Sequence, residues 1–368
     1  MKRSTALRIL APLALLIAAC GGGEQAEAPA PAPAPQETAP AQEAEEEVVD
    51  LGPAVTLTIS HPFPATHTIG GGVLVPFAEE ILLASGGNIE MEVFPGGALS
   101  GGPPTYENVV AGAIDVGLAL QGYTAGRFPV TSVMELPFVA SGLTAVQLTE
   151  IMWDVYEEFD VFQDEYSDVK ILALFTHEPG YFWSSGRQIR TIEDFSGLVL
   201  RSPGPLSGNF IDGLGAASVG MPPAELFDSL ERGVIDGLTI TANGIYDFSL
   251  LDVIDYGTGF GAYTSPFFIV MNRGKWDALT DAQRAFLDEH TGRALSIRAA
   301  QAYDDAVANA LVAIADAGIE ITELEPAELA RWQEVADGII ETWIAQREAD
   351  GKPGRALYER VLELKAQR

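Results

Sequence analysis

Arg201 is the residue in this sequence best placed to bind an anion. It ends the apolar run Gly197–Leu200, and the Pro/Gly-rich break Ser202–Gly204 follows it directly. An apolar run bounded by turn residues is typical of a buried strand, and ligands of open α/β sheets bind where strands end. Because a guanidinium is planar and always charged, it can hold a carboxylate through two parallel hydrogen bonds. A carboxylate site at Arg201 is therefore one interpretation, and an ion pair with a surface carboxylate is the other.

Other candidate binding residues also follow predicted strands. Gln121 and Tyr123 come directly after the apolar run 116–120, where the end of the strand should face a ligand. A tyrosine offers both a ring face and a hydroxyl, although a plain loop tyrosine explains Tyr123 equally well. Phe63 and His67 follow the run 54–60 in the same way. For His67 the alternative role is to cap the helix that begins nearby.

The remaining reactive residues form no motif that favours an enzyme, a cofactor or a metal site. Gly70–Gly72 precedes a predicted helix, but neither the Walker lysine nor the spaced glycines of a dinucleotide-binding loop accompany it. His177-Glu178 begins like a zinc-protease motif, yet position 181 holds tyrosine where the second histidine belongs. The histidines are too far apart in sequence to suggest a ligand cluster. They are His61, His67, His177 and His290.

Strands and helices alternate along the part of the chain that must position these residues. Apolar periodicity predicts strands at 54–60, 89–94, 116–120 and 169–175, and helices at 73–84, 106–112 and 143–166. Such alternation favours a mainly parallel sheet covered by helices, and hence the α/β class. Since a single core rarely grows beyond about 250–300 residues, the 368 residues are expected to form two lobes.

A short internal repeat supports two lobes of similar construction. Gly112–Asp115 reads Gly-Ala-Ile-Asp, and Gly233–Asp236 reads Gly-Val-Ile-Asp. Each copy follows a short predicted helix and precedes an apolar run. A glycine that ends a helix and an aspartate that turns the chain explain both copies. Chance similarity is the alternative for so short a repeat.

The C-terminal part is predicted to be mostly helical. Thr280–Gln283 reads as a capping box, and the helical pattern continues past Gly292 to about Ala317. A helix of that length would reach roughly 55 Å at about 1.5 Å per residue, which is longer than one lobe is wide. It must therefore run along both lobes or break near Gly292. A strand at 319–324 and helices at 326–349 and 355–365 complete the pattern.

The acidic composition excludes several classes of partner. The chain holds 52 acidic and 21 basic residues, which gives a formal net charge of −31. A polyanion would be repelled across such a surface, so nucleic acid and anionic lipid headgroups are poor partners. A saline habitat and a plain need for solubility explain the acidity equally well.

The N-terminus reads as a lipoprotein signal. Three basic residues precede the apolar segment Ile9–Ala19, which is too short to span a bilayer as a mature helix. Cys20 follows Leu-Ile-Ala-Ala, a pattern that resembles a lipobox, so lipidation is expected; an inert buried thiol is the alternative. Residues 1–19 then form a signal peptide, and the Pro/Ala/Glu-rich residues 20–53 form a disordered tether. These features place the protein in the periplasm or on the outer face of the cell envelope, anchored by lipid.

The stretch around Arg201 carries residues and spacings that match one known family. They are Asp194–Arg201, Leu214–Ala216, Val219–Pro222, Glu225–Leu230 and Gly233–Gly237. Similar landmarks occur at His67, Phe77–Glu79, Val93–Pro95, Gly112–Asp115 and Leu136–Phe138. In these positions the chain resembles the DctP-type solute-binding receptors of TRAP (tripartite ATP-independent periplasmic) transporters. The resemblance covers roughly residues 55–290, and the C-terminal tail is similar only in its helical character.

This resemblance implies a two-lobed type II periplasmic-binding-protein fold with a long helix that spans both lobes. The first lobe would comprise residues 54–175 with about 263–290, and the second would comprise 176–262 with about 291–368. In the family, the arginine at the position of Arg201 grips the carboxylate of the solute. The receptor would deliver a small organic acid to TRAP permease subunits in the membrane, which draw on an ion gradient rather than on ATP.

Two departures from the family pattern narrow the expected solute. Tyr181 stands where many acid-binding members carry a second arginine, and Ile240 stands where members that bind sialic acid carry asparagine, with Thr241 and Asn243 just beyond. One arginine with an apolar or aromatic lining suits a small monocarboxylate. The candidate lining residues are Tyr181, Phe182, Trp183 and Phe267. Core packing is the alternative for each of these aromatic side chains.

Two other functions are compatible with the same fold. A receptor of this kind can hand its ligand to a sensor kinase instead of a permease. An unrecognised enzyme on the same scaffold is the second alternative.

Overall fold

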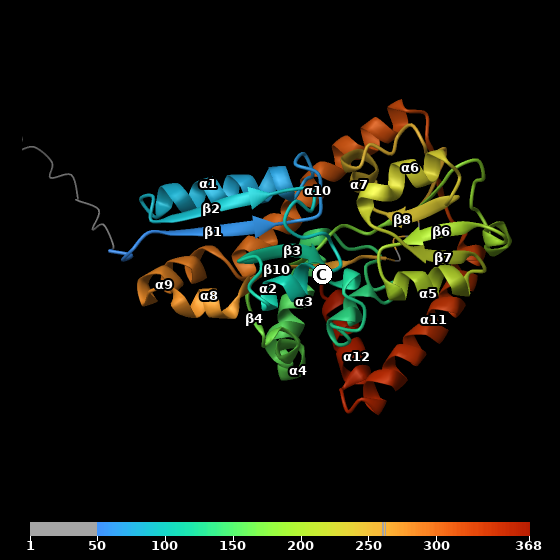
Figure 1. The fold of residues 1–368 in the computed structure, drawn as a ribbon. Coiled ribbons are helices and arrows are strands. Elements are labelled where there is room, and N and C mark those ends of the chain that lie inside the picture. The colour runs from blue at the N-terminus through green and yellow to red at the C-terminus, as the bar shows by residue number, and fades with distance from the viewer. Residues whose placement is uncertain (1–49, 260, 262) are drawn as a thin grey trace, which may run out of the picture. The chain divides into compact units, whose positions relative to one another are not determined.

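The computed structural model of the protein describes residues 50–259, 261 and 263–368. The predicted signal peptide, Cys20 and most of the predicted tether lie outside these residues. Among the described residues, no helix has both the length and the apolar character needed to cross a bilayer. This part of the chain is built on two separate sheets (Figure 1).

We call the part built on the five-stranded sheet the first lobe. In spatial order its strands are β2 (Ile89–Phe94), β1 (Val55–Ser60), β3 (Val116–Leu120), β10 (Pro266–Asn272) and β4 (Val169–Thr176). β1 pairs in parallel with β2 and β3, whereas β10 runs antiparallel between β3 and β4. Every residue of β3 is buried, as expected for a central strand covered on both faces. The helices of this lobe are α1 (Val75–Ala84), α2 (Thr105–Val110), α3 (Ala145–Glu158), α4 (Asp160–Gln163), α8 (Arg273–Ala278) and α9 (Asp281–His290).

The second lobe is the part built on the six-stranded sheet. In spatial order its strands are β11 (Glu320–Glu323), β9 (Tyr256–Gly259), β5 (Tyr181–Ser184), β8 (Gly237–Ile240), β6 (Val199–Ser202) and β7 (Ala217–Gly220). β6 pairs in parallel with β7 and β8, and β5 runs antiparallel between β8 and β9. Its helices include α5 (Pro205–Gly213), α6 (Leu226–Glu231) and α7 (Ala242–Asp247).

The two sheets repeat one topology. The parallel trio β2-β1-β3 corresponds to β7-β6-β8, and an antiparallel strand follows the third member in each case. The chain passes from the first lobe to the second between β4 and β5, and it returns between β9 and β10. The α/β class and the two-lobed arrangement predicted from the sequence are confirmed.

The long C-terminal helix differs from the prediction in one respect. It breaks at Gly292, whose φ of 68° lies in the left-handed region that favours glycine, so α9 ends at His290 and α10 (Arg293–Asp316) begins a new helix. The 24 residues of α10 still reach about 36 Å. Leu295 packs in the core of the first lobe and Ile314 in that of the second. A helix that spans both lobes is therefore confirmed, but the continuous helix to Ala317 is not.

Two other helices begin or end differently from the prediction. The helix expected at 143–166 ends at Glu158, because Phe159 takes an extended conformation, and the short α4 follows. The helix expected at 73–84 is preceded by a π-helical turn, Gly70–Leu74, which leads directly into α1.

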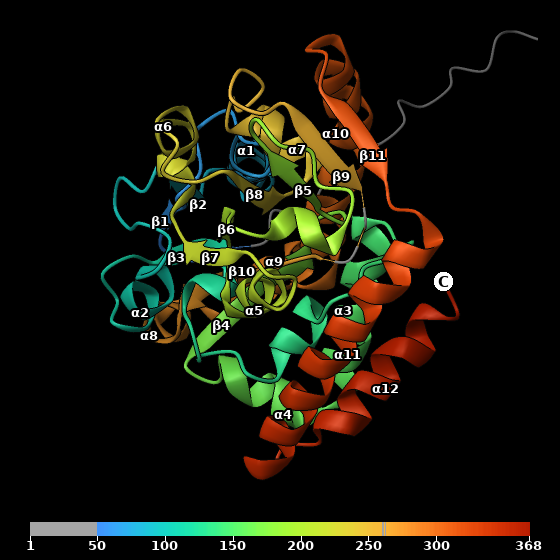
Figure 2. The ribbon, with the colours of Figure 1, turned by 90° about the vertical axis from the view of Figure 1, so that its right-hand side faces the viewer.

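The last two helices, α11 (Pro326–Ala349) and α12 (Gly354–Lys365), lie side by side (Figure 2). α11 packs against α5 of the second lobe, whereas α12 packs against α3 of the first lobe. Trp332 and Leu357 join Leu148 and Phe195 in one apolar cluster that extends across both lobes. The residue boundaries assigned to the lobes from the sequence stay a prediction.

Candidate functional site

A small cavity lies where strands of both sheets end. Its volume is about 40 Å³, which leaves room for a few water molecules at most. Six aromatic side chains line it, namely Phe63, Tyr123, Phe248, Tyr263, Phe267 and Tyr303. The ionisable or polar lining residues are His67, His177, Arg201, Thr241 and Asp247. The first lobe and α10 supply most of the rings, and the second lobe supplies the guanidinium.

Arg201 is a buried cation without an anionic partner. It lies on β6, between Val219 of β7 and Leu238 of β8, and only 2% of its surface is exposed. Its Nε donates to the Met221 carbonyl oxygen at 3.1 Å, and Nη1 donates to the Thr239 carbonyl oxygen at 3.4 Å. No carboxylate among the described residues forms a salt bridge with it. Two carbonyl dipoles orient the guanidinium but do not neutralise it, and a buried unpaired charge is costly.

Tyr123 lies beside this guanidinium. Burial raises the pKa of the Tyr123 hydroxyl to about 12, and the neighbouring Arg201 acts in the opposite direction. The pKa of Tyr263 is also raised by burial, again opposed by Arg201. Both phenols therefore stay neutral at physiological pH. They surround the guanidinium with rings and hydroxyls rather than with a counter-ion.

Neither histidine of the cavity supplies a second positive charge. Burial lowers the pKa of His67 to about 3 and that of His177 to about 4, so both rings are neutral at pH 7. His67 Nδ1 accepts from the Ile69 amide at 3.1 Å, which assigns the ring proton to Nε2. His177 Nε2 accepts from the Ser265 amide at 3.1 Å, which assigns its proton to Nδ1. Arg201 is thus the only cation that lines the cavity among the described residues.

Asp247 brings one carboxylate to the same cavity. Its side chain is 5% exposed and extends from the last residue of α7. Oδ2 accepts from the Thr68 amide at 3.1 Å and from Asn243 Nδ2 at 3.0 Å, and it lies 3.6 Å from His67 Nε2. Because Thr68 and His67 belong to the first lobe, their contacts with Asp247 also link the two lobes. Burial raises the pKa of Asp247 from its ordinary value.

Two further buried carboxyls lie near the cavity but do not neutralise Arg201. Burial raises the pKa of Glu135 and of Glu178 to about 8. Both are therefore mostly protonated at pH 7. One oxygen of each carboxyl, Oε1 of Glu135 and Oε2 of Glu178, lacks a hydrogen-bond partner in the described part of the chain.

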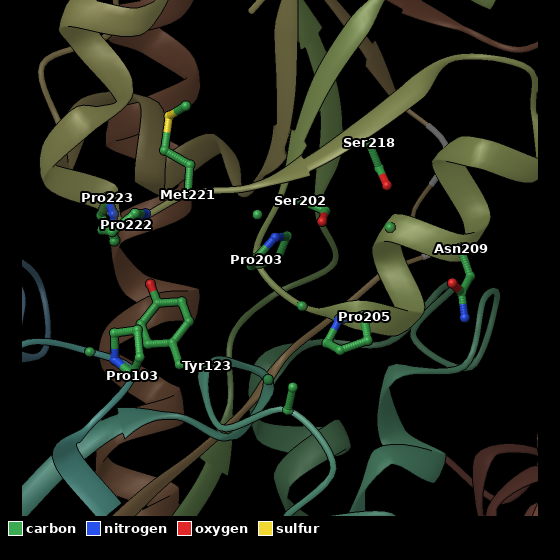
Figure 3. Close-up of a pocket in the computed structure, with 16 residues that line it drawn as sticks. Pro103, Tyr123, Ser202, Pro203, Pro205, Asn209, Ser218, Met221, Pro222 and Pro223 are labelled. Atoms are coloured by element: carbon green, nitrogen blue, oxygen red, sulfur yellow. The ribbon is translucent and has the colours of Figure 1, made fainter.

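A second, larger cavity adjoins the first. Its volume is about 400 Å³, and it shares Tyr123, Pro203 and Pro223 with the smaller cavity. Figure 3 shows the Tyr123 ring beside Pro103, with its hydroxyl directed toward the Met221–Pro223 segment. None of the residues that line this larger cavity is charged. Size alone would favour it as the binding site, but Arg201 and Asp247 line the smaller cavity and not the larger one. We therefore interpret the larger cavity as the approach to the smaller one.

The structure brings five of the eight candidate ligand-binding residues to the smaller cavity. They are His67, Tyr123, Arg201, Thr241 and Phe267. All five lie at the ends of strands or in the adjoining loops, which is where ligands of α/β sheets bind. Thr241 also caps α7 by accepting from the Gly244 amide at 2.9 Å. His67 also lines the cavity, but the alternative that it caps the adjoining helix is wrong: neither the turn Gly70–Leu74 nor α1 has a side-chain cap, and His67 Nδ1 accepts from the Ile69 amide instead.

Gln121, Asn243 and Tyr181 lie outside the lining of this cavity. Gln121 Nε2 donates to the Tyr166 hydroxyl at 2.6 Å, inside the first lobe. Asn243 Nδ2 donates to Thr68 Oγ1 at 2.8 Å and so bridges the lobes behind the cavity wall. Tyr181 lines a separate hollow beside Glu323. Side chains of a strand alternate between its faces, and the neighbouring Phe182 and Trp183 are buried in the two cores on either side of the sheet.

Sequence reasoning missed several lining residues, and some of them left a signal. Asp247 follows Asn243 by four residues, so both lie on one face of a helix. Tyr303 follows Leu295 and Ala299 at helical spacing on the inner face of α10. His177 was weighed only as part of a metal motif. In the described part of the chain, no three His, Cys, Asp or Glu residues are arranged to hold a metal ion.

Comparison with known proteins gives a consistent family match. Residues 59–346 match the sequence profile of DctP, described as bacterial extracellular solute-binding protein, family 7. The outer membrane transporter protein TsaT of Comamonas testosteroni is 23% identical over 288 residues, which cover 77% of this chain and 83% of TsaT.

Two solved structures share the fold along almost their whole length. A marine metagenome TRAP solute-binding protein specific for aromatic acids, crystallised with 3-hydroxybenzoate, is 29% identical. Its TM-score is 0.81, over 86% of this chain and 99% of that one. A TRAP solute-binding protein from Rhodoferax ferrireducens T118, with copurified benzoate, is 26% identical. Its TM-score is 0.80, over 85% of this chain and 98% of that one.

Proposed function

Because this chain belongs to the DctP family, the bacterial extracellular solute-binding proteins of family 7, we propose that it captures a small organic monocarboxylate through Arg201. As a TRAP solute-binding protein it would then deliver the acid to the membrane permease. The proposed solute has an aromatic or otherwise apolar body. Lipidation at Cys20 would keep the receptor at the cell envelope.

The uncompensated guanidinium of Arg201 is the observation that carries this proposal. Its exposed surface is 2%, and no carboxylate of the described chain pairs with it, although the protein carries a net charge of −31. Burying such a group is unfavourable unless an anion completes it. A carboxylate from outside would supply the missing charge and accept two parallel hydrogen bonds. We therefore infer that the buried Arg201 lowers the stability of the ligand-free protein and that an anionic ligand would restore it.

The aromatic lining supports a solute with an apolar body. Six rings surround the space next to Arg201, and Phe267 stacks on Phe175 with ring centroids 4.8 Å apart. Rings in such walls prefer offset or edge contacts with another ring. Relatives of the same fold were crystallised with benzoate and with 3-hydroxybenzoate. Because Arg201 is the only cation that the described residues contribute to the lining, we expect the solute to carry a single carboxylate.

Capture requires the two lobes to part and close again. A cavity of about 40 Å³ cannot admit a ring-sized acid as it stands, so the solute must enter while the lobes are apart. Asn243 and Asp247 of the second lobe bond Thr68 of the first lobe, and these contacts would re-form on closure. Closure removes water from the ion pair with Arg201, which strengthens it.

Calorimetric titration of the intact protein with benzoate, phenylacetate, pyruvate and citrate tests this proposal. We expect a saturable affinity for at least one aromatic monocarboxylate and a loss of about a hundredfold or more in Arg201→Ala. Arg201→Lys should recover only part of the affinity, since it keeps the charge but loses the planar fork. Arg232→Ala is the matched control, because Arg232 is exposed and pairs only with the exposed Asp228. Equal affinities in wild type and Arg201→Ala would remove Arg201 from the site.

A further inference from the structure

We propose that Asp247 is the second recognition group of the cavity and selects an acid that carries a hydroxyl group at the end remote from its carboxylate. This inference rests on the proposed function, because Arg201 must hold the carboxylate first. It extends that function from a general monocarboxylate to a hydroxylated aromatic monocarboxylate.

The free oxygen of Asp247 is the starting point. All the hydrogen bonds that its carboxylate accepts from the described residues, those of Thr68 and Asn243, go to Oδ2. His67 Nε2 also lies near Oδ2, at 3.6 Å. Oδ1 accepts no hydrogen bond from the described residues, although the side chain is 95% buried and lines the cavity. Oδ1 is not one of the fully buried atoms that lack a partner in the described part of the chain, so water can reach it. A solute hydroxyl that takes the place of this water would supply the donor when the cavity closes.

Asp247 and Arg201 line one cavity without pairing with each other. Each charged residue has its own aromatic neighbours. Tyr123 and Tyr263 lie near Arg201, whereas His67 and Phe248 lie near Asp247. Phe63 stacks on His67 at 4.5 Å between ring centroids and meets Phe267 at 6.0 Å. The cavity therefore has a positive end, an aromatic middle and a negative end. A ring that bears a carboxylate and a separate hydroxyl matches this order.

The same arrangement predicts which acids are rejected. A second carboxylate on the ring would meet Asp247 as a like charge, and the neutral His67 could not offset it. A methoxy group in place of the hydroxyl could not donate, so Oδ1 would stay unsatisfied. Sites built to bind a hydroxyl discriminate strongly against analogues that lack it, because a buried polar group is then left unpaired.

The test is a calorimetric comparison of matched acids on the intact protein. The probes are benzoate with 3- and 4-hydroxybenzoate, phenylacetate with 3-hydroxyphenylacetate, 3-methoxybenzoate, and the dicarboxylate isophthalate. We expect at least one hydroxylated acid to bind about tenfold or more tightly than its parent acid. The methoxy acid and isophthalate should bind no better than benzoate. Asp247→Ala should reduce the preference for the hydroxyl to about one.

Asn243→Ala is the control for a merely structural role. Asn243 bridges to Thr68 and bonds Asp247 Oδ2, but it does not line the cavity. It should weaken the binding of parent and hydroxylated acids by the same factor, leaving their ratio unchanged. Asp247→Asn keeps the shape of the side chain, serves if the alanine variant is unstable, and should relieve the rejection of isophthalate.

The outcomes separate this inference from the proposed function. If acids bind through Arg201 but wild type shows no preference for any hydroxylated probe, the role of Asp247 is refuted while the receptor function stands. An unchanged preference in Asp247→Ala also refutes it. If no probe binds at all, or if Arg201→Ala binds as well as wild type, the proposed function itself fails.

Discussion

The two lobes share one topology but differ in what they place at the end of the equivalent strand. In the first lobe β1 leads to His61, Phe63 and His67, which are buried and neutral. In the second lobe β6 carries Arg201 to the corresponding edge of the sheet. One lobe therefore contributes rings without charge, and the other contributes a charge held by main-chain carbonyl oxygens.

Under the proposed function, this difference would separate the tasks of holding and orienting a solute. A cation held by main-chain carbonyl groups cannot follow a moving ligand, so the solute would have to come to it. The rings of the first lobe can close over an apolar body from the opposite side. Such a division requires that the first lobe stay uncharged, because a second cation would make the cavity suited to a dianion.

Removing the charge from the second lobe should have the largest effect. Arg201→Met replaces the guanidinium by an apolar chain and should lower the affinity for benzoate-type acids about a thousandfold, since a buried ion pair that loses one partner costs about 3–5 kcal/mol. The melting temperature of the protein without solute should stay the same or rise, because a buried unpaired charge has been removed. Calorimetry and thermal unfolding measure the two effects.

The exposed Arg232→Met variant serves as the control for this experiment. It should change neither the affinity nor the melting temperature. A marked fall in the melting temperature of Arg201→Met would show that the guanidinium stabilises the lobe through its bonds to Met221 and Thr239. That result would contradict the view that it is held at a cost for the ligand.

The neutrality of the first lobe can be tested through the pH dependence of stability. The pKa of His67 is lowered from 6.5 to about 3 in the folded protein, so below pH 6.5 the unfolded chain binds a proton that the folded chain does not. The free energy of unfolding must then fall as the pH falls, by up to about 1.4 kcal/mol per pH unit for this one group. His67→Gln should remove that share between about pH 6 and pH 4 in denaturant titrations.

His290→Gln is the comparison variant, because His290 lies on α9 outside the cavity. A loss of pH-dependent slope that occurs in His67→Gln and not in this variant would be specific to the cavity. If His67→Gln loses stability on acidification as steeply as wild type, His67 is charged in the folded protein. In that case the first lobe would also contribute a positive charge to the cavity, as the second lobe does through Arg201.

The contact that fastens the lobes should have a smaller effect. Thr68 of the first lobe and Asn243 of the second form a hydrogen bond of 2.8 Å. Thr68→Val and Asn243→Ala should each weaken the binding of all acids by about fivefold to tenfold, since one hydrogen bond contributes about 1 kcal/mol. The double variant should lose little more than Asn243→Ala alone, because that variant already removes the shared bond together with the bond from Asn243 to Asp247 Oδ2. Fully additive losses would mean that the two residues act separately.

The sequence predicted the parts of this comparison that depend on local pattern. Three features could be predicted from the order of residues. They are the positions of Arg201, Tyr123 and His67 after strands, the alternation of strands and helices, and the repeat around Asp115 and Asp236. The local sequence did not show that Phe182 and Trp183 are both buried, in different cores. Their burial depends on which faces of the sheet are covered by other elements. Asp247 and Tyr303 were missed since their roles arise only when α7 and α10 meet the loops of the first lobe.

The internal repeat gives the smallest predicted effect and the most direct test of equivalence between the lobes. Asp115 Oδ2 accepts from the Thr58 amide of β1 at 2.9 Å, and Asp236 Oδ2 accepts from the Val199 amide of β6 at 2.7 Å. Both aspartates follow a glycine with positive φ, Gly112 at 73° and Gly233 at 66°. The carboxylate of the repeat thus supplies the acceptor for a strand amide that has no ladder partner.

Asp115→Asn and Asp236→Asn should each destabilise the protein by about 0.5–1.5 kcal/mol, because a neutral amide oxygen is a weaker acceptor than a carboxylate. Hydrogen exchange resolves the lobes: the first variant should speed exchange of the Thr58 amide and the second that of Val199, each without affecting the other. Asp228→Asn, which removes only an exposed pair with Arg232, should affect neither amide. If only one of the two variants has an effect, the repeat is a coincidence of sequence. If each variant affects both amides, the lobes do not open independently, and closure cannot be the simple movement of one lobe against the other.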